Sequence, residues 1–304
     1  TGGIARKIRL YGLDPSSLHV EYSDCICTPA KLSSLRWKPG SGGRIVGSGD
    51  YDGVVTEYDL ETKSSVFERD EHGGRRIWSV DYSRQSSLSA GVCASASDDG
   101  SIHVWDPRCE SGDCIATIRP SGTANRPVCS VEFDPRGGWG LAAGCADRLA
   151  YVYDTRMLAG PSHVLSGHTK TVTYVKFLDD RRLVSSSVDG CLMLWDLSKN
   201  DSDVARPVRT YKGHVNCRNF VGLSVLRGGG LLVCGSESNE VFIYDSRWGD
   251  PIWVRGFAAD DRSSGDGFVS SVCWRQVEGE EDDKCVLVAG GSDGALQVFQ
   301  GKRR

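Results

Sequence analysis

The sequence predicts an all-β fold, a seven-bladed β-propeller of four-stranded antiparallel blades. Three observations lead to this prediction. Seven aromatic residues recur at similar spacing, a turn built on Asp precedes most of them at a fixed distance, and apolar β-rich runs lie upstream of each turn. Repeats that start from ~40–45 residues are typical of propeller blades. We expect one domain over residues 1–304.

The aromatic residues each close a short β-rich run and are usually followed by Asp. Their spacing ranges from 42 to 55 residues, and the longer steps indicate loops inserted between strands. Seven such positions predict seven blades. They are Tyr11, Tyr58, Trp105, Tyr153, Trp195, Tyr244 and Phe299.

A turn position lies five residues before each aromatic residue, and Gly occupies it in four units. Asp-Gly between two β-rich runs is a strong hairpin signal, because Gly adopts positive φ at little cost. The pair Ser238-Asn239 departs from Asp-Gly, so the geometry of that turn does not follow from the pattern. The residues directly before the turn positions are Ala5, Asp52, Asp99, Asp147, Asp189, Ser238 and Asp293.

Two apolar runs upstream of each turn supply two more strands of the unit. In the third unit these runs cover 77–82 and 92–97, rich in β-branched, aromatic and small residues. Each unit is therefore expected to contain strands a, b and c, followed by a weaker and more polar strand d that leads to the next unit.

The first and last units are incomplete. The first offers only strand c, around 6–11, and strand d, whereas the last ends after strand c at Phe299. A closed ring needs strands a and b for the first blade and strand d for the last, since native proteins avoid open sheet edges. We therefore expect residues upstream of Thr1 to supply these strands.

The overall composition gives no reason to expect nucleic acid or membrane as a partner. The chain has 40 acidic and 36 basic side chains, a net charge of −4. It contains no apolar run near the ~20 residues of a membrane helix, and its first residues lack a signal-peptide pattern. We expect a soluble protein of the nucleus and cytoplasm.

The twelve cysteines indicate small core residues rather than a metal site. Most are scattered through apolar runs, and the only close pairs are Cys25 with Cys27 and Cys109 with Cys114. Neither pair has a second Cys or His pair at zinc-site spacing. We expect no metal and no cofactor, and reduced thiols fit the cytosol or nucleus.

The meander sorts residues onto two faces. The loops from strand d to strand a and the turns from b to c share one face, called here the top face. The turns from a to b and the ends of strand c lie on the other, the bottom face. Comparing equivalent positions across the units then singles out residues that the repeat does not require.

Two aromatic residues stand out on the top face. The second position of strand a is small or medium-sized in every unit except at Trp78, and the residue before the turn Asp is aromatic only at Tyr51. Lys31, Arg75, Arg76 and Lys170 lie in or beside loops from d to a. An aromatic pair among cations fits a short peptide with an apolar anchor and acidic flanks.

A structural interpretation remains open for these residues. Trp78 would then fill a gap between blades, and the cations would be solvated loop charges. Phe220 lies at a position that is apolar in every unit, so core packing accounts for it at least as well as binding does.

The repeat motifs resemble those of a known family. Gly167-His168, Val188-Asp189-Gly190 and Leu194-Trp195-Asp196 resemble the signature of WD repeats. In that family the His, Ser, Asp and Trp of one blade hydrogen-bond in a chain, so the resemblance implies structural roles rather than catalysis. Outside these repeat positions the sequence offers no recognisable nucleophile, phosphate loop or metal cluster, and we expect no enzyme. The implied sets are His72, Ser95, Asp99 and Trp105, and His168, Ser185, Asp189 and Trp195.

Three c strands end with Arg two residues after Asp, on the bottom face. Trp105-Asp106-Pro107-Arg108 resembles the box by which WD-repeat substrate receptors dock on the adaptor of cullin-4 ubiquitin ligases. The resemblance implies an adaptor-docking site at Trp105, Asp106 and Arg108. The alternative is an Arg paired with a carboxylate of a neighbouring blade. The other two boxes end at Arg156 and Arg247.

Longer stretches are similar to the propeller of the plant constitutively photomorphogenic ubiquitin ligase. No RING or coiled-coil pattern accompanies them, and among relatives that consist of the propeller alone the chain most resembles the Repressor of UV-B Photomorphogenesis family. The similar stretches cover residues 48–53, 76–82, 172–178, 219–223 and 235–241.

This resemblance implies a partner and a role. In the ligase family the top face holds Val-Pro peptides of photoreceptors and transcription factors. By resemblance this chain binds the carboxy-terminal tail of the UV-B photoreceptor, promotes its return to the inactive dimer and competes with the ligase. The alternative is a substrate receptor of a cullin-4 ligase that recruits a transcription factor for degradation. The implied peptide-binding residues are Lys31, Tyr51, Arg76, Trp78, Lys170 and Phe220.

Overall fold

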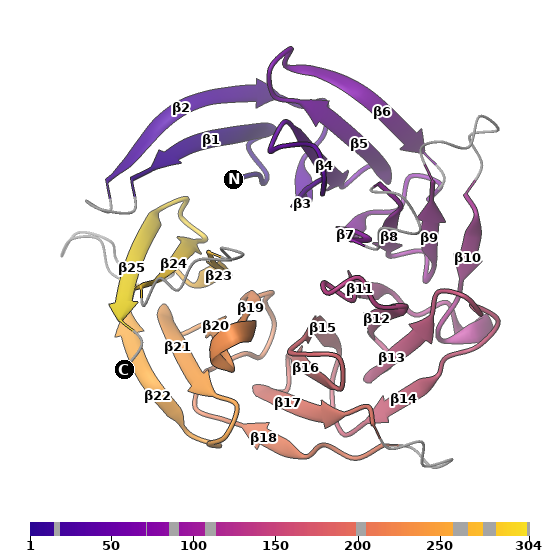
Figure 1. The fold of residues 1–304 in the computed structure, drawn as a ribbon, viewed down its shortest axis with the longest axis vertical. Helices are drawn as coiled ribbons and strands as arrows, with labels where there is room; N and C mark the ends of the chain where they lie inside the picture. Colours follow the sequence, from indigo (N-terminus) through magenta and orange to yellow (C-terminus); the bar gives the residue numbers. More distant parts are fainter. Residues whose placement is uncertain are drawn as a thin grey trace.

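The structure is a computed structural model, and it has the predicted architecture of seven sheets arranged around a central axis (Figure 1). We number the blades 1 to 7 in chain order. In the complete blades each strand pairs antiparallel with the next one along the chain, and strand a is innermost (Figure 1). The described residues are 1–14, 19–70, 72–84, 91–106, 114–198, 205–257, 267–275 and 284–302.

Blades 2 to 6 each have four strands. Blade 2 consists of β3 (Leu32–Trp37), β4 (Ile45–Asp50), β5 (Val54–Asp59) and β6 (Ser64–Asp70). Blade 3 consists of β7 (Ile77–Tyr82), β8 (Cys93–Ser97), β9 (Ile102–Trp105) and β10 (Ala116–Ile118). Blade 4 consists of β11 (Val128–Phe133), β12 (Gly140–Cys145), β13 (Leu149–Asp154) and β14 (His163–Ser166).

Blades 5 and 6 repeat this order. Two short 3₁₀ helices lie in loops, η2 (Gly122–Ala124) between β10 and β11 and η3 (Arg227–Gly229) between β19 and β20. Blade 5 consists of β15 (Val172–Phe177), β16 (Arg182–Ser187), β17 (Cys191–Asp196) and β18 (Arg209–Tyr211). Blade 6 consists of β19 (Leu223–Leu226), β20 (Leu231–Gly235), β21 (Glu240–Asp245) and β22 (Pro251–Gly256).

Among the described residues, the first and last blades have the incomplete strand sets that the sequence predicts. Blade 1 has two strands, β1 (Lys7–Leu13) and β2 (Val20–Cys27), and blade 7 has three, β23 (Val269–Trp274), β24 (Lys284–Gly291) and β25 (Leu296–Lys302). The two blades are neighbours in the ring (Figure 1). No helix of the described residues is long and apolar enough to cross a membrane.

The turn residue before strand c has the same sign of φ in all seven blades. The residue at each turn position has positive φ, which Gly and Asn tolerate best. Asn239 therefore takes the place of Gly, and the turn that departs from Asp-Gly keeps the common geometry. The residues are Arg6, Gly53, Gly100, Arg148, Gly190, Asn239 and Gly294, with φ between 53° and 89°.

Apolar clusters between neighbouring blades form the core. One cluster combines Ile102 of blade 3 with Leu141 of blade 4, and another combines Leu183 of blade 5 with Val152 of blade 4. Each of these side chains is at most 5% exposed. Burial of apolar surface on both sides of each sheet is what holds the ring of blades together.

Polar bonds also join the a strands of neighbouring blades. Asp81 of blade 3 accepts the backbone N–H of Phe133 in blade 4 at 2.8 Å, and Glu132 of blade 4 accepts that of Phe177 in blade 5 at 2.6 Å. Glu132 also accepts bonds from Lys176 Nζ at 2.8 Å and Arg227 Nη2 at 3.3 Å. One nearly buried carboxylate therefore links blades 4, 5 and 6 near the axis.

The expected His–Asp–Ser–Trp chains are present in blades 3 and 5. His72 bonds Asp99 at 2.9 Å and Ser95 Oγ at 2.8 Å, and the indole N–H of Trp105 donates to the same Ser95 Oγ at 3.0 Å. Burial alone would raise the pKa of Asp99, but the hydrogen bonds from His72 and Ser101 hold it below its usual value. In blade 5 the same contacts join His168 to Asp189 and Ser185, and Trp195 to Ser185.

Candidate functional site

Trp78 lies at a β-bulge at the start of strand a. In β7 the pairing with β8 jumps from Ile77 to Ser79, so Trp78 has no partner in the register. A bulge redirects the side chain of its extra residue. Blades 5 and 7 have the same bulge, but there Thr173 and Ser270 use their hydroxyl groups to bond a carbonyl of their own sheet. Trp78 instead extends toward other blades and is half-buried.

Backbone bonds place the loops from d to a beside the turns from b to c. Tyr51 N–H donates to the carbonyl of Lys31 at 2.9 Å, and Asp98 N–H donates to that of Arg76 at 2.9 Å. The turn of blade 2 also packs on the loop of blade 3, because a Cβ at Gly53 would lie 2.8 Å from the carbonyl oxygen of Arg75. Residues of blades 2 and 3 are therefore held together on the top face.

The guanidinium group of Arg76 lies between two aromatic rings. Its Cζ is 3.9 Å from the ring centroid of Tyr51 and 4.6 Å from that of Trp78. Lys31 Nζ lies 6.0 Å from the Tyr51 ring on the exposed rim. Cation–π contacts of this kind contribute roughly 0.5–2 kcal/mol each, and they hold the rings and cations in one contiguous set.

Phe220 joins this set from blade 6. Its ring stacks on Trp78 with centroids 4.5 Å apart and planes 4° apart, and it meets Tyr174 edge-on at 5.7 Å. The sequence alignment placed Phe220 at the first position of strand a, whereas β19 begins only at Leu223. The positive φ of Gly222 separates Phe220 from the strand, and the ring is half-buried rather than part of the closed core.

Five of the six residues predicted for a peptide site therefore lie in one chain of contacts: Lys31, Tyr51, Arg76, Trp78 and Phe220. The sixth, Lys170, is exposed in the loop before β15, and no hydrogen bond, ion pair or ring contact among the described residues joins it to the others.

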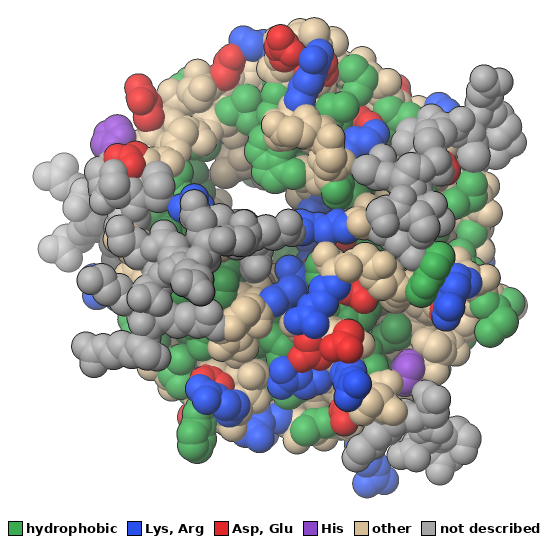
Figure 2. Space-filling model, viewed as in Figure 1, with side chains coloured by type: hydrophobic (Ala, Val, Ile, Leu, Met, Phe, Trp, Pro, Cys, Tyr) green, Lys and Arg blue, Asp and Glu red, His purple; other side chains and the backbone are tan. Residues whose placement is uncertain are grey.

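Cations on the two faces differ in their partners. Within the described part of the chain, no ion pair involves Lys31, Arg76 or Lys170 of the top face. On the bottom face, Arg44 and Arg182 each lie within 2.7 Å of a carboxylate oxygen. Figure 2 looks onto the bottom face, where Lys and Arg side chains gather beside Asp and Glu side chains near the centre of the disc. Among the described residues, these three predicted site cations therefore differ from Arg44 and Arg182 in having no carboxylate partner.

Two residues that the sequence analysis did not assign also contact this set. The carboxylates of Asp98 and Glu237 accept hydrogen bonds from Trp78 and from the loop that carries Phe220. Both occupy the repeat position before the turn Asp or its equivalent, the position at which Tyr51 stood out. A charged side chain at this position is the sequence feature that could have identified them.

In two of the bottom-face boxes the arginine pairs with the Asp of its own box and, among the described residues, not with a carboxylate of a neighbouring blade. Arg156 Nε and Nη2 donate to Asp154 of the same box at 2.9 and 2.5 Å, and Arg247 donates to Asp245 at 2.9 and 2.6 Å. Neither guanidinium group pairs with a carboxylate of a neighbouring blade in the described residues.

The predicted docking box around Trp105 is described only in part. Trp105 is 1% exposed, and its indole N–H donates to Ser95 Oγ. Its side chain is therefore not available at the surface. Asp106 is half-buried. Arg108 lies outside the described residues.

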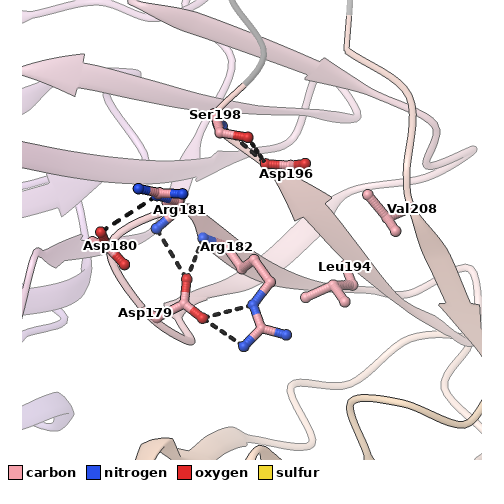
Figure 3. Close-up of a pocket in the computed structure, with 8 residues that line it drawn as sticks. All are labelled: Asp179, Asp180, Arg181, Arg182, Leu194, Asp196, Ser198 and Val208. Carbon is pink, nitrogen blue, oxygen red and sulfur yellow. Dashed lines mark hydrogen bonds and ion pairs between the residues drawn. The ribbon is translucent and has the colours of Figure 1, made fainter.

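A hollow of about 510 Å³ lies on the bottom face beside the turn between β15 and β16 (Figure 3). Its charged groups are already paired, since Asp179 accepts from Arg182 at 2.6 Å and Asp196 accepts from Ser198 at 2.6 Å. Leu194 and Val208 supply its apolar wall. None of the residues predicted for binding lines this hollow.

Comparison with known proteins gives the same repeat. The family described as "WD domain, G-beta repeat" matches residues 63–106, 112–154 and 159–196. The chain is 58% identical to WD repeat-containing protein RUP2 of Arabidopsis thaliana, over all of this chain and 84% of the relative. It is also 58% identical to RUP1 of that plant, over 77% of the relative, and 37% identical to its E3 ubiquitin-protein ligase COP1, over 98% of this chain and 42% of the ligase.

Proposed function

Because the chain belongs to the family of the WD repeat-containing proteins RUP1 and RUP2, we propose that it is a non-enzymatic propeller that represses UV-B signalling. In this proposal it binds the carboxy-terminal tail of the plant UV-B photoreceptor through a Val-Pro motif and promotes the return of the photoreceptor to the inactive dimer. It acts in the nucleus and cytoplasm, without a cofactor.

The observation that supports this proposal most is the contiguous set of aromatic rings and cations on the top face. Trp78, Tyr51 and Phe220 offer aromatic surface for the apolar residues of a peptide. A Val-Pro segment is well suited to such a surface, because Pro restricts the free peptide and lowers the entropy lost on binding.

Arg76 would then recognise the peptide backbone or an acidic flank. Its guanidinium group contacts two aromatic rings, has no ion pair among the described residues, and keeps N–H donors for a carboxylate or carbonyl oxygen. Lys31 and Lys170 add positive charge on the exposed rim and would attract acidic residues on either side of the Val-Pro anchor.

The histidines support a non-enzymatic role. His72 and His168 are each engaged at both ring nitrogens in a network that repeats from blade to blade. A repeated buried network is expected of a scaffold rather than of one active site.

The proposal is tested by the recovery of the photoreceptor dimer. Monomers produced by UV-B light are expected to dimerise faster when this protein is added, because the bound tail brings the propeller to the photoreceptor. Size-exclusion chromatography or unheated gel electrophoresis over time measures the rate. A photoreceptor that lacks its tail is the control, and equal acceleration of this control would contradict the role of the tail.

A second function is favoured by the bottom-face boxes. A role as substrate receptor of a cullin-4 ubiquitin ligase, with a transcription factor as client, needs an arginine presented to the adaptor. At the two equivalent positions the guanidinium groups of Arg156 and Arg247 are held bidentately by their own Asp and remain exposed. An arginine fixed in this way is pre-oriented for a further carboxylate or carbonyl group.

Replacing Arg108 with alanine is expected to reduce recovery of the cullin-4 adaptor in a pull-down, because Arg108 completes the only box of this form that begins with Trp. Arg181→Ala is the matched control, because Arg181 is 73% exposed on the bottom face and belongs to none of the three boxes. Equal adaptor recovery by the wild type and the Arg108 variant would remove adaptor docking, but would leave tail binding unaffected.

A further inference from the structure

One repeat position supplies three residues to the top-face site. The residue before the turn Asp or its equivalent is Tyr51 in blade 2, Asp98 in blade 3 and Glu237 in blade 6. In blades 4, 5 and 7 the same position holds an uncharged residue, namely Ala146, Val188 and Ser292. Charged side chains therefore occur here only in the two blades that provide Trp78 and Phe220.

Asp98 fixes the orientation of the Trp78 indole. Its Oδ1 accepts the indole N–H at 2.5 Å, while its own backbone N–H is bonded to Arg76. The backbone of Asp98 is thus anchored independently of its carboxylate. The side-chain bond directs the indole N–H toward Asp98 and so restrains the rotation of the indole, which also stacks on Phe220.

Glu237 holds the loop that carries Phe220. Its Oε1 accepts the backbone N–H groups of Arg218 and Asn219 at 2.8 and 2.7 Å and the side-chain amide of Asn219 at 3.1 Å. These three donors lie directly before Phe220 in the chain, where no regular strand has yet begun. The carboxylate therefore holds the loop from which the ring is presented.

We propose that Asp98 and Glu237 are positioning residues that set Trp78 and Phe220 parallel across the top face, and so determine the affinity of the site for its apolar anchor. The proposal rests on the proposed function of the top face as a peptide site. Neither carboxylate needs to touch the peptide, because each acts through the ring that it orients. The 4° angle between the two rings is the arrangement they maintain.

The first test compares Asp98→Ala with Asp98→Asn. Alanine removes the acceptor, whereas the amide oxygen of asparagine can still accept the indole N–H. In calorimetry with a tail peptide that contains Val-Pro, we expect the alanine variant to bind about fivefold more weakly or worse and the asparagine variant to stay within about twofold of wild type. Equal weakening by both variants would overturn the role of the hydrogen bond.

A double-mutant cycle separates positioning from other effects of the carboxylate. Trp78→Phe keeps an aromatic ring but removes the N–H donor. In that background Asp98→Ala is expected to cause no further loss of affinity. The same loss in both backgrounds would mean that Asp98 acts directly on the peptide, and would contradict positioning through Trp78.

The orientation of the indole is measured on the free protein by NMR. The indole N–H signal of Trp78, identified by its loss in Trp78→Phe, is expected to shift in Asp98→Ala and to remain near its wild-type position in Asp98→Asn. An unchanged signal in Asp98→Ala would refute the proposal. This measurement needs no ligand, so it distinguishes failure of the positioning role from failure of tail binding itself.

Glu237 is tested by the same logic. Glu237→Gln keeps an acceptor for the Arg218 and Asn219 N–H groups and is expected to retain affinity, whereas Glu237→Ala is expected to lose about fivefold. In a Phe220→Ala background the loss caused by Glu237→Ala should disappear. Persistence of that loss would show that Glu237 does not act through Phe220.

Discussion

Replacing Trp78 with alanine is expected to weaken binding of the photoreceptor tail peptide by about 2 kcal/mol or more, a rise in Kd of roughly 30-fold. The indole contacts both Arg76 and Phe220, so its loss removes the centre of the contact chain. Isothermal titration calorimetry with the Val-Pro peptide measures the effect.

Trp248→Ala is the matched control for this variant. Trp248 is 62% exposed in the turn between β21 and β22, on the bottom face, and its removal is expected to leave Kd unchanged. Circular dichroism should give the same spectrum for both variants. Unaltered affinity of a folded Trp78→Ala protein would end the case for a top-face peptide site.

Replacing Glu132 with alanine is expected to lower the free energy of unfolding by about 3–5 kcal/mol. The side chain of Glu132 is 6% exposed, and it pairs with Lys176 and Arg227, which are 10% and 19% exposed. Its removal leaves two largely buried cations and the N–H of Phe177 without their acceptor. Chemical denaturation followed by tryptophan fluorescence measures the change.

Lys176→Met separates the carboxylate from the ion pair. In this variant Glu132 keeps Arg227 and the Phe177 N–H as donors, and the apolar methionine fills much of the space of the lysine stem. We expect a clearly smaller loss than for Glu132→Ala. Equal losses would mean that the Lys176 ion pair, rather than the shared acceptor, supports the junction.

The fold could be predicted because each blade repeats its own signals within a few tens of residues. The aromatic residue of strand c, the turn before it and the apolar runs are local features, and the structure has seven sheets at the predicted places. Even the departure at Ser238-Asn239 kept the common turn, since Asn tolerates positive φ.

The site was predictable to the extent that residues deviate from the repeat. Trp78 and Tyr51 deviate in size, and the meander topology places them on one face. Phe220 matches the apolar pattern, so its stacking on Trp78 could not be read from the sequence. That contact depends on the closed ring, which brings blades 3 and 6 together across the axis.

The polar contacts were the least predictable. The bond from Trp78 to Asp98 depends on the rotation of one side chain at a bulge, and the pairing of Arg156 with Asp154 depends on how a short turn folds back. Neither spacing nor composition determines these angles. A charged residue at the position of Asp98 and Glu237 showed that these two blades depart from the repeat. It did not show which donor group each carboxylate would bond.

Because Trp78 stacks on Phe220, the proposed binding surface exists only in the closed ring of blades. The two rings belong to blades that share no sheet, and they meet only while every intervening blade junction is closed. A ligand that bridges them therefore favours the closed molecule and raises its resistance to unfolding by mass action. Conversely, a lesion at a remote junction, such as that of Glu132, would diminish ligand affinity without touching the contact surface.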